Sequence, residues 1–498
     1  MSSVTFRESV VVIIDTSRTH IRAGLGLHDL LRTPAIEIPA CVGIRPSAFS
    51  TLNGSDEQPQ ASTSNAALAS AKVTDYLVGT QLDEALAAGQ DVTVYWPFAD
   101  GDVSDWTQAE ALWKHVLFNQ LQLRRIQMES PVLLSMMPGL SRDSYERVSQ
   151  MFFERFNVAG FAVLDRPMAQ FYATITGQDL SGVVIDVGQD YTDITPIHDG
   201  FPVHNARTSL KYGINDCERY LAYLLRSNQG VVSALSPPEK ELSPDELDQV
   251  LVELSRHIWK EGLVKVLAEG EAADIEEEGV TDIAAVLVAG KEKAVIESGM
   301  KKRANAKATA AEQARAREIE ALDLITVQFR ELSLTLGKER HRFCEPLFDP
   351  TLLSAVKGSE GKPYGEQEYR ALQAAVGHAV GQVEPDYRQY VWQGLLVTGE
   401  LSNSIKGLGA ALQARLSPFI LSNADQMNEV QPKGIRVLKI PEYFAEYREK
   451  GDGLASFLGS SIVAKLTFTD SSGKNFVSKA DYVSYGPSAV IDMSPMLL

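Results

Sequence analysis

Two stretches of the chain show the same pattern of apolar and polar positions. Each is a short apolar run that ends in an aspartate, followed by a turn and a second extended stretch. The first pairs residues 11–15 with 19–24, and the second pairs residues 183–188 with 191–197. A strand that ends in a carboxylate and a tight turn is typical of a hairpin that holds phosphate. The pattern predicts two hairpins, in two related lobes, that could hold a nucleotide between them.

The turn residues argue against phosphate binding by the first hairpin. Backbone amides approach a phosphate closely only where side chains are absent, so such loops need glycine. Residues 16–19, after Asp15, read TSRT and contain no glycine, whereas residues 187–190, after Asp186, read VGQD and contain one. The layout indicates a nucleotide site in which the residues that would contact phosphate have changed.

Helical periodicity and a buried strand follow the first hairpin. Apolar residues recur at helical spacing over residues 106–121, where Asp105 can cap the first turn, and again over 141–156, where Ser141 begins the helix. Residues 131–135 between them read PVLLS, a buried strand. Strands that alternate with helices indicate an α/β architecture. The positions expected to face inward are Trp106, Ala109, Leu112, Trp113, Val116, Leu117 and Leu121 in the first helix and Tyr145, Val148, Met151, Phe152 and Phe156 in the second.

Two segments lack such periodicity. Residues 50–70 are polar and simple in composition, which predicts a flexible surface loop. Residues from about 233 to 330 form a charged insertion, acidic at 270–279 and rich in Ala, Lys, Arg and Glu at 300–323. Basic residues there could touch phosphate, or the segment could be a solvated helix or a disordered insertion. These basic residues are Lys301, Lys302, Arg303, Lys307, Arg315 and Arg317.

Composition narrows the function classes. A chain of 498 residues with 44% hydrophobic content predicts several domains with substantial cores. The formal net charge of −18 argues against direct, sequence-independent nucleic-acid binding, because that binding needs a basic surface to displace counterions. No run of about 18 apolar residues is present, so we expect no membrane span, and the N-terminus does not read as a secretory signal.

Cysteine and histidine usage excludes the common metal sites. The three cysteines are far apart, which fits a reducing compartment. No Cys-x-x-Cys or His-x-x-x-His pair occurs, so we expect no metal. The eight histidines are dispersed and are interpreted as structural. Gly-x-Ser-x-Gly and Walker-type loops are not found, so these motifs give a hydrolase triad or P-loop enzyme no support.

Several runs resemble actin, in the order in which actin has them. Residues 337–350 (GKERHRFCEPLFDP) are similar to actin's Gly-Asn-Glu-Arg-Phe-Arg run and the Glu-x-Leu-Phe-x-Pro that follows it. Residues 131–134, 151–157, 457–466 and 486–488 also resemble actin. The resemblance covers roughly 10–45, 75–225 and 325–498, and it implies an actin-like two-lobed α/β fold, with duplicated sheet-and-helix domains around a central cleft. It places the first lobe at 1–180, the second at 181–440, and a C-terminal segment at 441–498 that returns to the first lobe.

The same resemblance identifies a vestigial cofactor site. Asp15, Asp186, Gly188 and Gly399 match positions that contact ATP in actin. The two acids could hold a magnesium nucleotide, or they could simply cap turns by accepting hydrogen bonds from backbone amides. We expect no catalytic residue and no bound cofactor, while ATP binding without hydrolysis remains an open alternative.

Four positions depart from the actin pattern. Arg22 replaces a lysine on the returning strand, Asp190 stands where a glycine belongs, and Glu400 follows Gly399 in place of a second glycine. Arg166 corresponds to the glutamine that positions the attacking water. Because arginine is always protonated, it cannot accept a proton. We hypothesise that Arg166 neutralises Asp15 and Asp186 and locks the two lobes without a nucleotide.

Actins hold partner helices in an apolar cleft at the base of the lobes, and an amphipathic helix laid there would bury anchors at helical spacing. The alternative, that the matching residues are ordinary core, applies most to Ile462 and Val463. The matching residues are Tyr172, Ile175, Ile462, Val463 and Leu466.

Two further segments narrow the resemblance within the family. Residues 441–451 (PEYFAEYREKG) and the segment 185–197 are similar to actin-related subunits of the fungal chromatin-remodelling complexes SWI/SNF and RSC. This implies a nuclear, non-catalytic structural subunit. It would pair with actin-related protein 7, bind the helicase-SANT-associated helix of the remodeller ATPase, and contact other remodeller subunits. The alternatives are a nucleotide-binding actin-like ATPase and an actin-related subunit of a different nuclear complex.

Overall fold

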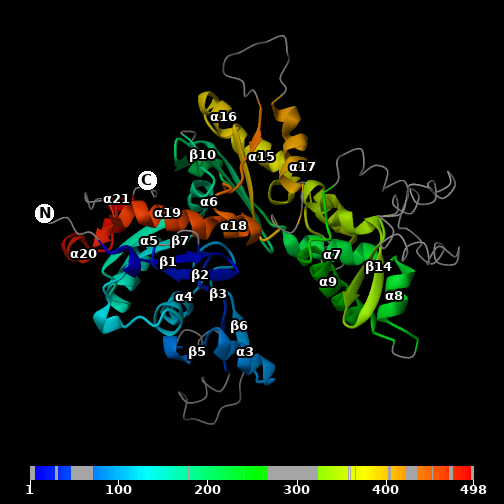
Figure 1. Ribbon diagram of the computed structural model, residues 1–498, viewed down its shortest axis with the longest axis horizontal. Helices are drawn as coiled ribbons and strands as arrows, with labels where there is room; N and C mark the ends of the chain where they lie inside the picture. The colour runs from blue at the N-terminus through cyan, green and yellow to red at the C-terminus, as the bar shows by residue number, and fades with distance from the viewer. Residues whose placement is uncertain are drawn as a thin grey trace, which may run out of the picture. The chain divides into compact units, whose positions relative to one another are not determined.

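The chain divides into two compact units, each taken by itself below. Unit 1 comprises Met1–Val184, Ile197–His204 and Lys439–Leu498, and unit 2 comprises Ile185–Pro196 and Asn205–Leu438. The predictions for residues 50–70 and for nearly all of 270–325 lie outside the described residues. The computed structural model (Figure 1) describes residues 6–27, 32–45, 71–175, 177, 180–238, 241–266, 323–356, 358, 361–364, 366–401, 405, 407–420, 434–450, 452–469 and 475–494.

The main sheet of unit 1 has the strand order β17-β8-β7-β1-β2-β3. The first predicted hairpin is confirmed, because β1 and β2 pair antiparallel, with Asp15 opposite Arg22. β7 runs parallel to both β1 and β8, so these three strands end at the same edge of the sheet. The strands are β1 (Val12–Thr16), β2 (His20–Leu25), β3 (Ile36–Pro39), β7 (Pro131–Met136), β8 (Gly160–Asp165) and β17 (Val477–Ser478).

The helices of unit 1 include both predicted ones. Asp105 caps α4 by accepting from the amides of Thr107 and Gln108, and Ser141 caps α5 by accepting from the amide of Ser144. Each helix ends in a π-helical turn. The helices are α3 (Thr80–Ala87), α4 (Trp106–Lys114) with η3 (His115–Gln120), α5 (Arg142–Gln150) with η5 (Met151–Arg155), α6 (Arg166–Tyr172), α18 (Ala445–Lys450), α19 (Ala455–Thr469), α20 (Lys479–Tyr485) and α21 (Ala489–Met493).

The core of unit 1 lies between these helices and the sheet. The inward positions predicted for the two helices are buried, except that Trp106 and Leu121 are half-buried at its margin. Phe152 stacks on Phe161 of β8, with ring centroids 4.6 Å apart. A small sheet of order β5-β4-β6 extends the unit. Its strands are β4 (Val42–Ile44), β5 (Tyr76–Leu77) and β6 (Thr93–Tyr95).

The C-terminal part of the chain packs into unit 1. In Figure 1, α19 lies along β1 and β7 and beside α6. A Cβ added to Gly459 of α19 would lie only 1.7 Å from the carbonyl oxygen of Ala169 in α6, so the two helices touch through their backbones. The preceding helix α18 is fixed by Tyr447, which is fully buried and donates to the carbonyl of Arg32 at 2.6 Å.

The second predicted hairpin, β9 and β10, is confirmed and lies in a sheet of order β11-β10-β9-β15-β16, with β12 paired to β10. β15 and β16 run parallel. Both main sheets thus contain a strand–Asp–turn–strand hairpin, and the predicted α/β class is confirmed. The strands are β9 (Gly182–Val187), β10 (Thr192–His198), β11 (Phe201–Pro202), β12 (Thr208–Leu210), β15 (Gly394–Gly399) and β16 (Arg436–Val437).

Helices and a two-stranded hairpin complete unit 2. The hairpin pairs β13 (Ile325–Phe329) with β14 (Leu332–Leu336), which ends directly before Gly337. α9 docks on α7 through Glu218, a buried carboxylate that accepts from Arg256 at 2.7 Å and from Trp259 at 2.9 Å. The helices are α7 (Ile214–Leu225), α8 (Gln229–Leu235), α9 (Pro244–Lys260), α14 (Glu345–Phe348), α15 (Leu372–Gly381), α16 (Pro385–Val391) and α17 (Leu408–Leu416).

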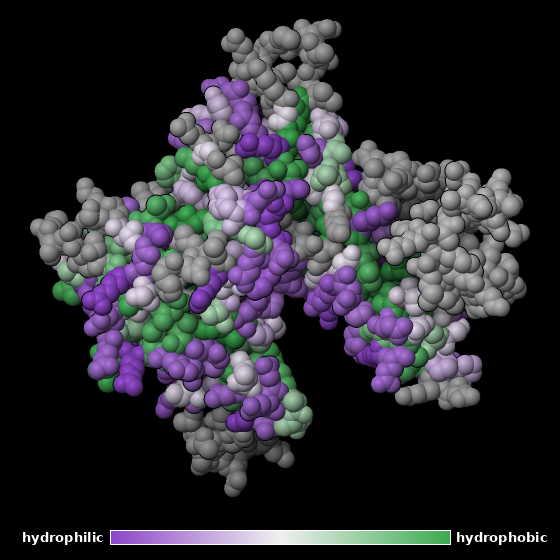
Figure 2. Space-filling model, viewed as in Figure 1, coloured by the Kyte–Doolittle hydropathy of each residue, from purple (hydrophilic) through white to green (hydrophobic). Residues whose placement is uncertain are grey.

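The surface is predominantly polar. On the face seen in Figure 2, hydrophilic residues cover much of each unit, and hydrophobic residues appear in smaller patches between them. The three cysteines, Cys41, Cys217 and Cys344, are buried thiols. Within the described ranges, no helix combines the length and the apolarity that crossing a bilayer requires.

Candidate functional site

The first candidate site lies in unit 1, where β1 and β8 end. Asp15 on β1 is level with Ser135 on β7, and Ser135 is level with Leu164 on β8. Arg166 begins α6 two residues later, at the same edge of the sheet. Its Nε donates to Asp15 Oδ1 at 3.2 Å, and both residues are buried. Ligands of open α/β sheets bind at the carboxyl ends of the strands. Here the Arg166 side chain lies at that edge and pairs with Asp15.

Two further groups surround this ion pair. Ser456, the second residue of α19, donates its hydroxyl to the same Asp15 oxygen at 2.7 Å. Asp165, directly before Arg166, accepts a hydrogen bond from the hydroxyl of Tyr145 at 2.8 Å. Both acids are about 1% exposed, so the arginine lies among charges that water does not reach. A buried charge is tolerated when it is paired and hydrogen-bonded, and these contacts satisfy Asp15 Oδ1. Asp15 Oδ2 is also buried and accepts no hydrogen bond from the described residues.

Arg22, which replaces the phosphate-contacting lysine of actin, also points to protein atoms. Its Nε donates to Glu37 on β3 at 3.0 Å, and one terminal nitrogen donates to the carbonyl of Gly453 at 3.1 Å. The residue is buried, with an exposed fraction of 7%. Arg22 therefore joins the hairpin to the turn that precedes α19.

The turn between β1 and β2 is held by its own serine. The hydroxyl of Ser17 accepts from the amides of Thr19 at 3.4 Å and His20 at 2.9 Å. The amide of Ser17 donates to the carbonyl of His20 at 2.8 Å. An amide that already donates to Ser17 is not available to a phosphate oxygen, so this turn has replaced an external acceptor with an internal one.

The second hairpin, in unit 2, packs against the start of α7. Its turn carbonyls, those of Gly188 and Gln189, accept from the amides of Ile214 at 3.0 Å and Asn215 at 2.9 Å. The amide of Gly188 donates within the turn, to Tyr191 at 2.9 Å. The positive end of this helix is therefore bonded to the hairpin itself.

Polar side chains of this turn are also hydrogen-bonded within unit 2. Asp190 accepts from the side chain of Asn215 at 2.9 Å. Gln189 donates to Glu400, which follows β15. Asp186 itself is half-buried on β9. The acids that stand in place of actin's glycines thus take part in contacts that hold the turn.

Two glycines of unit 2 are required by backbone packing. Gly399 has φ +109°, and a Cβ there would lie 2.3 Å from the carbonyl oxygen of Val187. A Cβ on Gly213 would lie 2.4 Å from the carbonyl oxygen of Gly188. Gly399, predicted as part of the cofactor site, therefore has a structural reason to be glycine that involves no ligand.

Taken unit by unit, these residues fit a magnesium triphosphate poorly. In unit 1, one oxygen of Asp15, both nearby arginines and three turn amides have protein partners. In unit 2 the turn adds acidic side chains where a phosphate would need amides, and like charges repel. No group of three or more metal-ligating side chains occurs among the described residues.

The predicted partner-helix residues all lie in unit 1, on α6 and α19 or next to them. Tyr172 and Ile175 are half-buried at the end of α6, and burial raises the pKa of the Tyr172 hydroxyl. On α19, Ile462 is half-buried, Val463 is 5% exposed and Leu466 is 63% exposed. Val463 thus packs as a core residue, whereas Leu466 presents an apolar side chain at the surface.

Sequence reasoning missed several residues of the first site. Ser456, Tyr145 and Asp165 complete the surroundings of the Asp15–Arg166 pair, and Gly213 shapes the second turn. Gly213 stands directly before a helix, Asp165 stands directly before Arg166, and Tyr145 was expected to face inward, but no spacing rule assigns them to these sites. Ser456 lies 441 positions from Asp15, so no local signal indicates it.

Two α/β units, each with a strand–Asp–turn–strand hairpin, are the arrangement of actin-like proteins. The Actin family model matches residues 6–493, so the chain belongs to the actin family, and the predicted actin-like fold is confirmed. A relative named "SWI/SNF and RSC complexes subunit arp9", from Schizosaccharomyces pombe, is 24% identical over 541 aligned positions, which cover 98% of this chain and 99% of the relative. The predicted resemblance to fungal actin-related protein 9 is therefore also confirmed.

Proposed function

We propose that this chain is a non-catalytic structural subunit of a nuclear, ATP-dependent chromatin-remodelling complex of the SWI/SNF or RSC type. The complex is suggested by the S. pombe relative, whose name gives those two assemblies and whose length matches end to end. The observation that carries the non-catalytic part is the contact between Arg166 and Asp15 at 3.2 Å. The Asp15 oxygen that binds the Arg166 guanidinium and the Ser456 hydroxyl is not available to a magnesium nucleotide.

The replacement of the water-positioning glutamine supports the same proposal. Hydrolysis needs a group that orients the attacking water by accepting a hydrogen bond from it. A guanidinium has only donors and cannot do this. Arg166 is also held by its own ion pair, so it is not free to reorient. Asp15, Asp186, Gly188 and Gly399 are then a vestigial nucleotide site whose residues have become structural.

We further propose that the two units are the two actin-like lobes, with boundaries near residues 180 and 440 and a C-terminal segment that belongs to the first lobe. The division of the chain at Val184 and Lys439 supports this assignment. In this proposal residues 233–330 are an insertion in the second lobe, of which α9 is the described, helical part.

The partner surface is proposed to lie on unit 1 around α6 and α19. The helicase-SANT-associated helix of the motor ATPase would place apolar anchors against Tyr172, Ile175, Ile462 and Leu466, and a second actin-related protein, actin-related protein 7, would pair with this chain. The exposure of Leu466, 63%, supports the surface, since an apolar side chain that large is available to a partner. Val463 would support the surface from beneath.

The partner surface is tested by Leu466→Asp. We expect the variant to fold normally but to lose most of the remodeller ATPase in a pull-down, because a carboxylate cannot enter an apolar helix interface without a large desolvation cost. Val483→Asp is the matched control, since Val483 is 86% exposed on α20 of the same unit. Equal retention of the ATPase by both variants would refute the proposed surface.

The proposed function as a whole is tested on the native protein. Mass spectrometry of the complex purified through this chain should find an SWI/SNF- or RSC-type ATPase; a histone-exchange ATPase would indicate a different nuclear complex. Isothermal titration of the isolated chain with Mg-ATP should show no binding. Tight binding followed by phosphate release would establish an active actin-like ATPase instead.

A further inference from the structure

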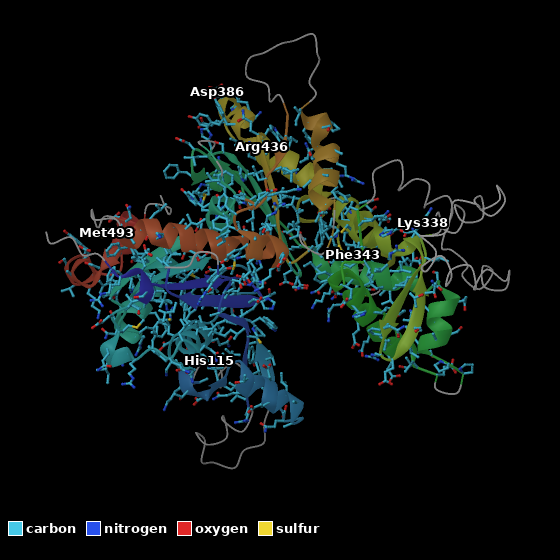
Figure 3. All side chains as sticks on the ribbon, in the orientation of Figure 1. His115, Lys338, Phe343, Asp386, Arg436 and Met493 are labelled. Carbon is cyan, nitrogen blue, oxygen red and sulfur yellow. The ribbon has the colours of Figure 1, made fainter. Side chains whose placement is uncertain are left out.

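Two adjacent residues of unit 2 hold the chain on both sides of residues 267–322. They are Arg340 and His341 on η7 (Lys338–Cys344), between Lys338 and Phe343, which Figure 3 labels. Arg340 Nε donates to the carbonyl of Leu263 at 3.1 Å. Its terminal nitrogens donate to the carbonyl of Asp323 at 2.6 Å and pair with the Asp323 carboxylate at 2.8 Å. One guanidinium thus bonds a residue that precedes residues 267–322 and a residue that follows them.

His341 repeats this arrangement with its two ring nitrogens. Its Nδ1 accepts from the backbone amide of Lys265 at 3.2 Å, and its Nε2 lies 2.7 Å from the Asp323 carboxylate. A backbone amide can only donate, so Nδ1 carries no proton, and Nε2 must be the nitrogen that donates to Asp323. The imidazole is therefore neutral, and its tautomer is set by the two bonds.

Burial and backbone conformation indicate that these contacts stabilise unit 2. Arg340 and His341 are 3% and 6% exposed, whereas the Asp323 side chain is 37% exposed, so water is kept from the guanidinium and imidazole ends of these bonds more than from the carboxylate end. Asp323 has φ +47°, a left-handed conformation that a non-glycine residue keeps only when its surroundings hold it there. Bringing the ends of a long segment together costs entropy, but that cost rises only slowly with length, so a few buried bonds can offset it.

We propose that Arg340 and His341 form a clamp that fastens Leu263–Lys265 to Asp323 and makes the fold of unit 2 independent of residues 267–322. The clamp joins the segment after α9 to the residue just before β13, and α9 and β13 pack together in the same unit. The clamp would therefore keep α9 and β13 packed against each other, whichever residues connect Lys265 to Asp323. This inference does not depend on the proposed function.

The test is made in the full chain. Residues 267–322 are replaced by a flexible Gly/Ser linker of about ten residues, long enough to join two clamped ends. We expect the midpoint of thermal unfolding to stay within about 2 °C of the parent, because the clamp already fixes both ends. A separate Arg340→Ala variant of the parent should lower that midpoint by about 10 °C, since it removes the ion pair with Asp323 and the hydrogen bonds to the carbonyls of Leu263 and Asp323.

Two variants serve as controls. Arg330→Ala removes an arginine whose ion pair with Glu253 is half exposed, and it should change the midpoint by no more than about 2 °C. Arg340→Lys keeps the charge without the planar fork and should give an intermediate decrease. An unfolded linker chain, or one that loses as much stability as Arg340→Ala, would overturn the proposal. Equal midpoints for Arg340→Ala and Arg330→Ala would overturn it too.

Discussion

The two aspartate hairpins share one layout but differ in the groups that pair with the aspartate and with the turn. In unit 1, Asp15 is buried and bound by Arg166 and Ser456, and the turn that follows it is closed by Ser17. In unit 2, Asp186 is half-buried, and the turn bonds to the first amides of α7. The aspartate of the first hairpin is therefore held by side chains, whereas the second hairpin also bonds to a helix start through its backbone.

Under the proposed function, the difference describes two ways in which a ligand site becomes structural. In unit 1 a guanidinium would take the place of a metal cation, and a hydroxyl would take the place of a phosphate oxygen. In unit 2, Asp190 and Glu400 replace glycines, and the space at Gly399 and Gly213 is used for close backbone packing. Glycine content alone is thus a poor measure of nucleotide binding, and the partners of the amides are more informative.

The largest expected effect is the loss of the unit 1 cation. Arg166→Ala should destabilise the protein by about 3–5 kcal/mol, because it leaves Asp15 buried without its charged partner. The measurement is the free energy of unfolding in urea. Arg142→Ala, which removes an exposed pair with Glu146, should cost less than about 0.5 kcal/mol.

A double substitution sharpens this prediction. Asp15→Asn together with Arg166→Met removes both charges and should recover most of the lost stability, because an uncharged pair needs no compensation. An Arg166→Ala variant as stable as Arg142→Ala would show that the unit 1 hairpin is not held by its ion pair, and the contrast between the hairpins would fail.

The next largest effect tests the backbone contacts of unit 2. Gly399→Ala should cost about 2–3 kcal/mol, since the added Cβ meets the Val187 carbonyl and φ +109° is unfavourable for alanine. Gly381→Ala at the end of α15 is the control: no atom lies within 4 Å of its added Cβ, and it should be neutral or slightly stabilising. Thermal unfolding of both variants measures the difference, and equal midpoints would contradict the proposed role of Gly399.

Mild acid should destabilise both units through their buried histidines. Burial lowers the pKa of His341 in unit 2 to about 4, and it also lowers the pKa of His115 in unit 1. A histidine with a depressed pKa binds its proton more weakly when folded than when unfolded. Stability is therefore complete above the unfolded pKa of 6.5 and falls as the pH drops from there towards 4.

For His341 this loss should reach about 1 kcal/mol between pH 7 and pH 5.5. His341→Gln should remove that part of the pH dependence while lowering stability at pH 7. Unfolding midpoints measured across this range for both proteins provide the comparison. A parent whose stability is flat from pH 7 to 5 would show that His341 is not held neutral.

The smallest effect concerns the turn of unit 1. Ser17→Ala should cost about 0.5–1 kcal/mol, because two turn amides lose their acceptor. Ser209→Ala in unit 2 is the matched control, since its hydroxyl bonds an exposed Asp193 at 2.6 Å, and it should have almost no effect. Urea unfolding resolves the two, and the reverse order would contradict the internal closure of the first turn.

The sequence predicted what local chemistry determines. Asp105 and Ser141 were recognised as caps because a cap acts on amides two or three residues away, and both hairpins followed from apolar runs that end at a turn. The Asp15 half of the Arg166 hypothesis is matched by a contact at 3.2 Å. Ser456 and the Arg22–Gly453 contact were missed, because their partners lie more than four hundred positions away and are set by strand register and helix packing.

The partners of Asp15 also bear on how the protein is made. Ser456 and all of α19 are synthesised more than four hundred residues after β1, yet they pack on it. The N-terminal sheet therefore stays incomplete until α19 has been synthesised, whereas nearly all of unit 2 is available before then. Domains generally fold as units during synthesis, so the middle of the polypeptide should mature before its beginning, and a nascent chain stalled before α19 would expose an apolar sheet face that attracts chaperones.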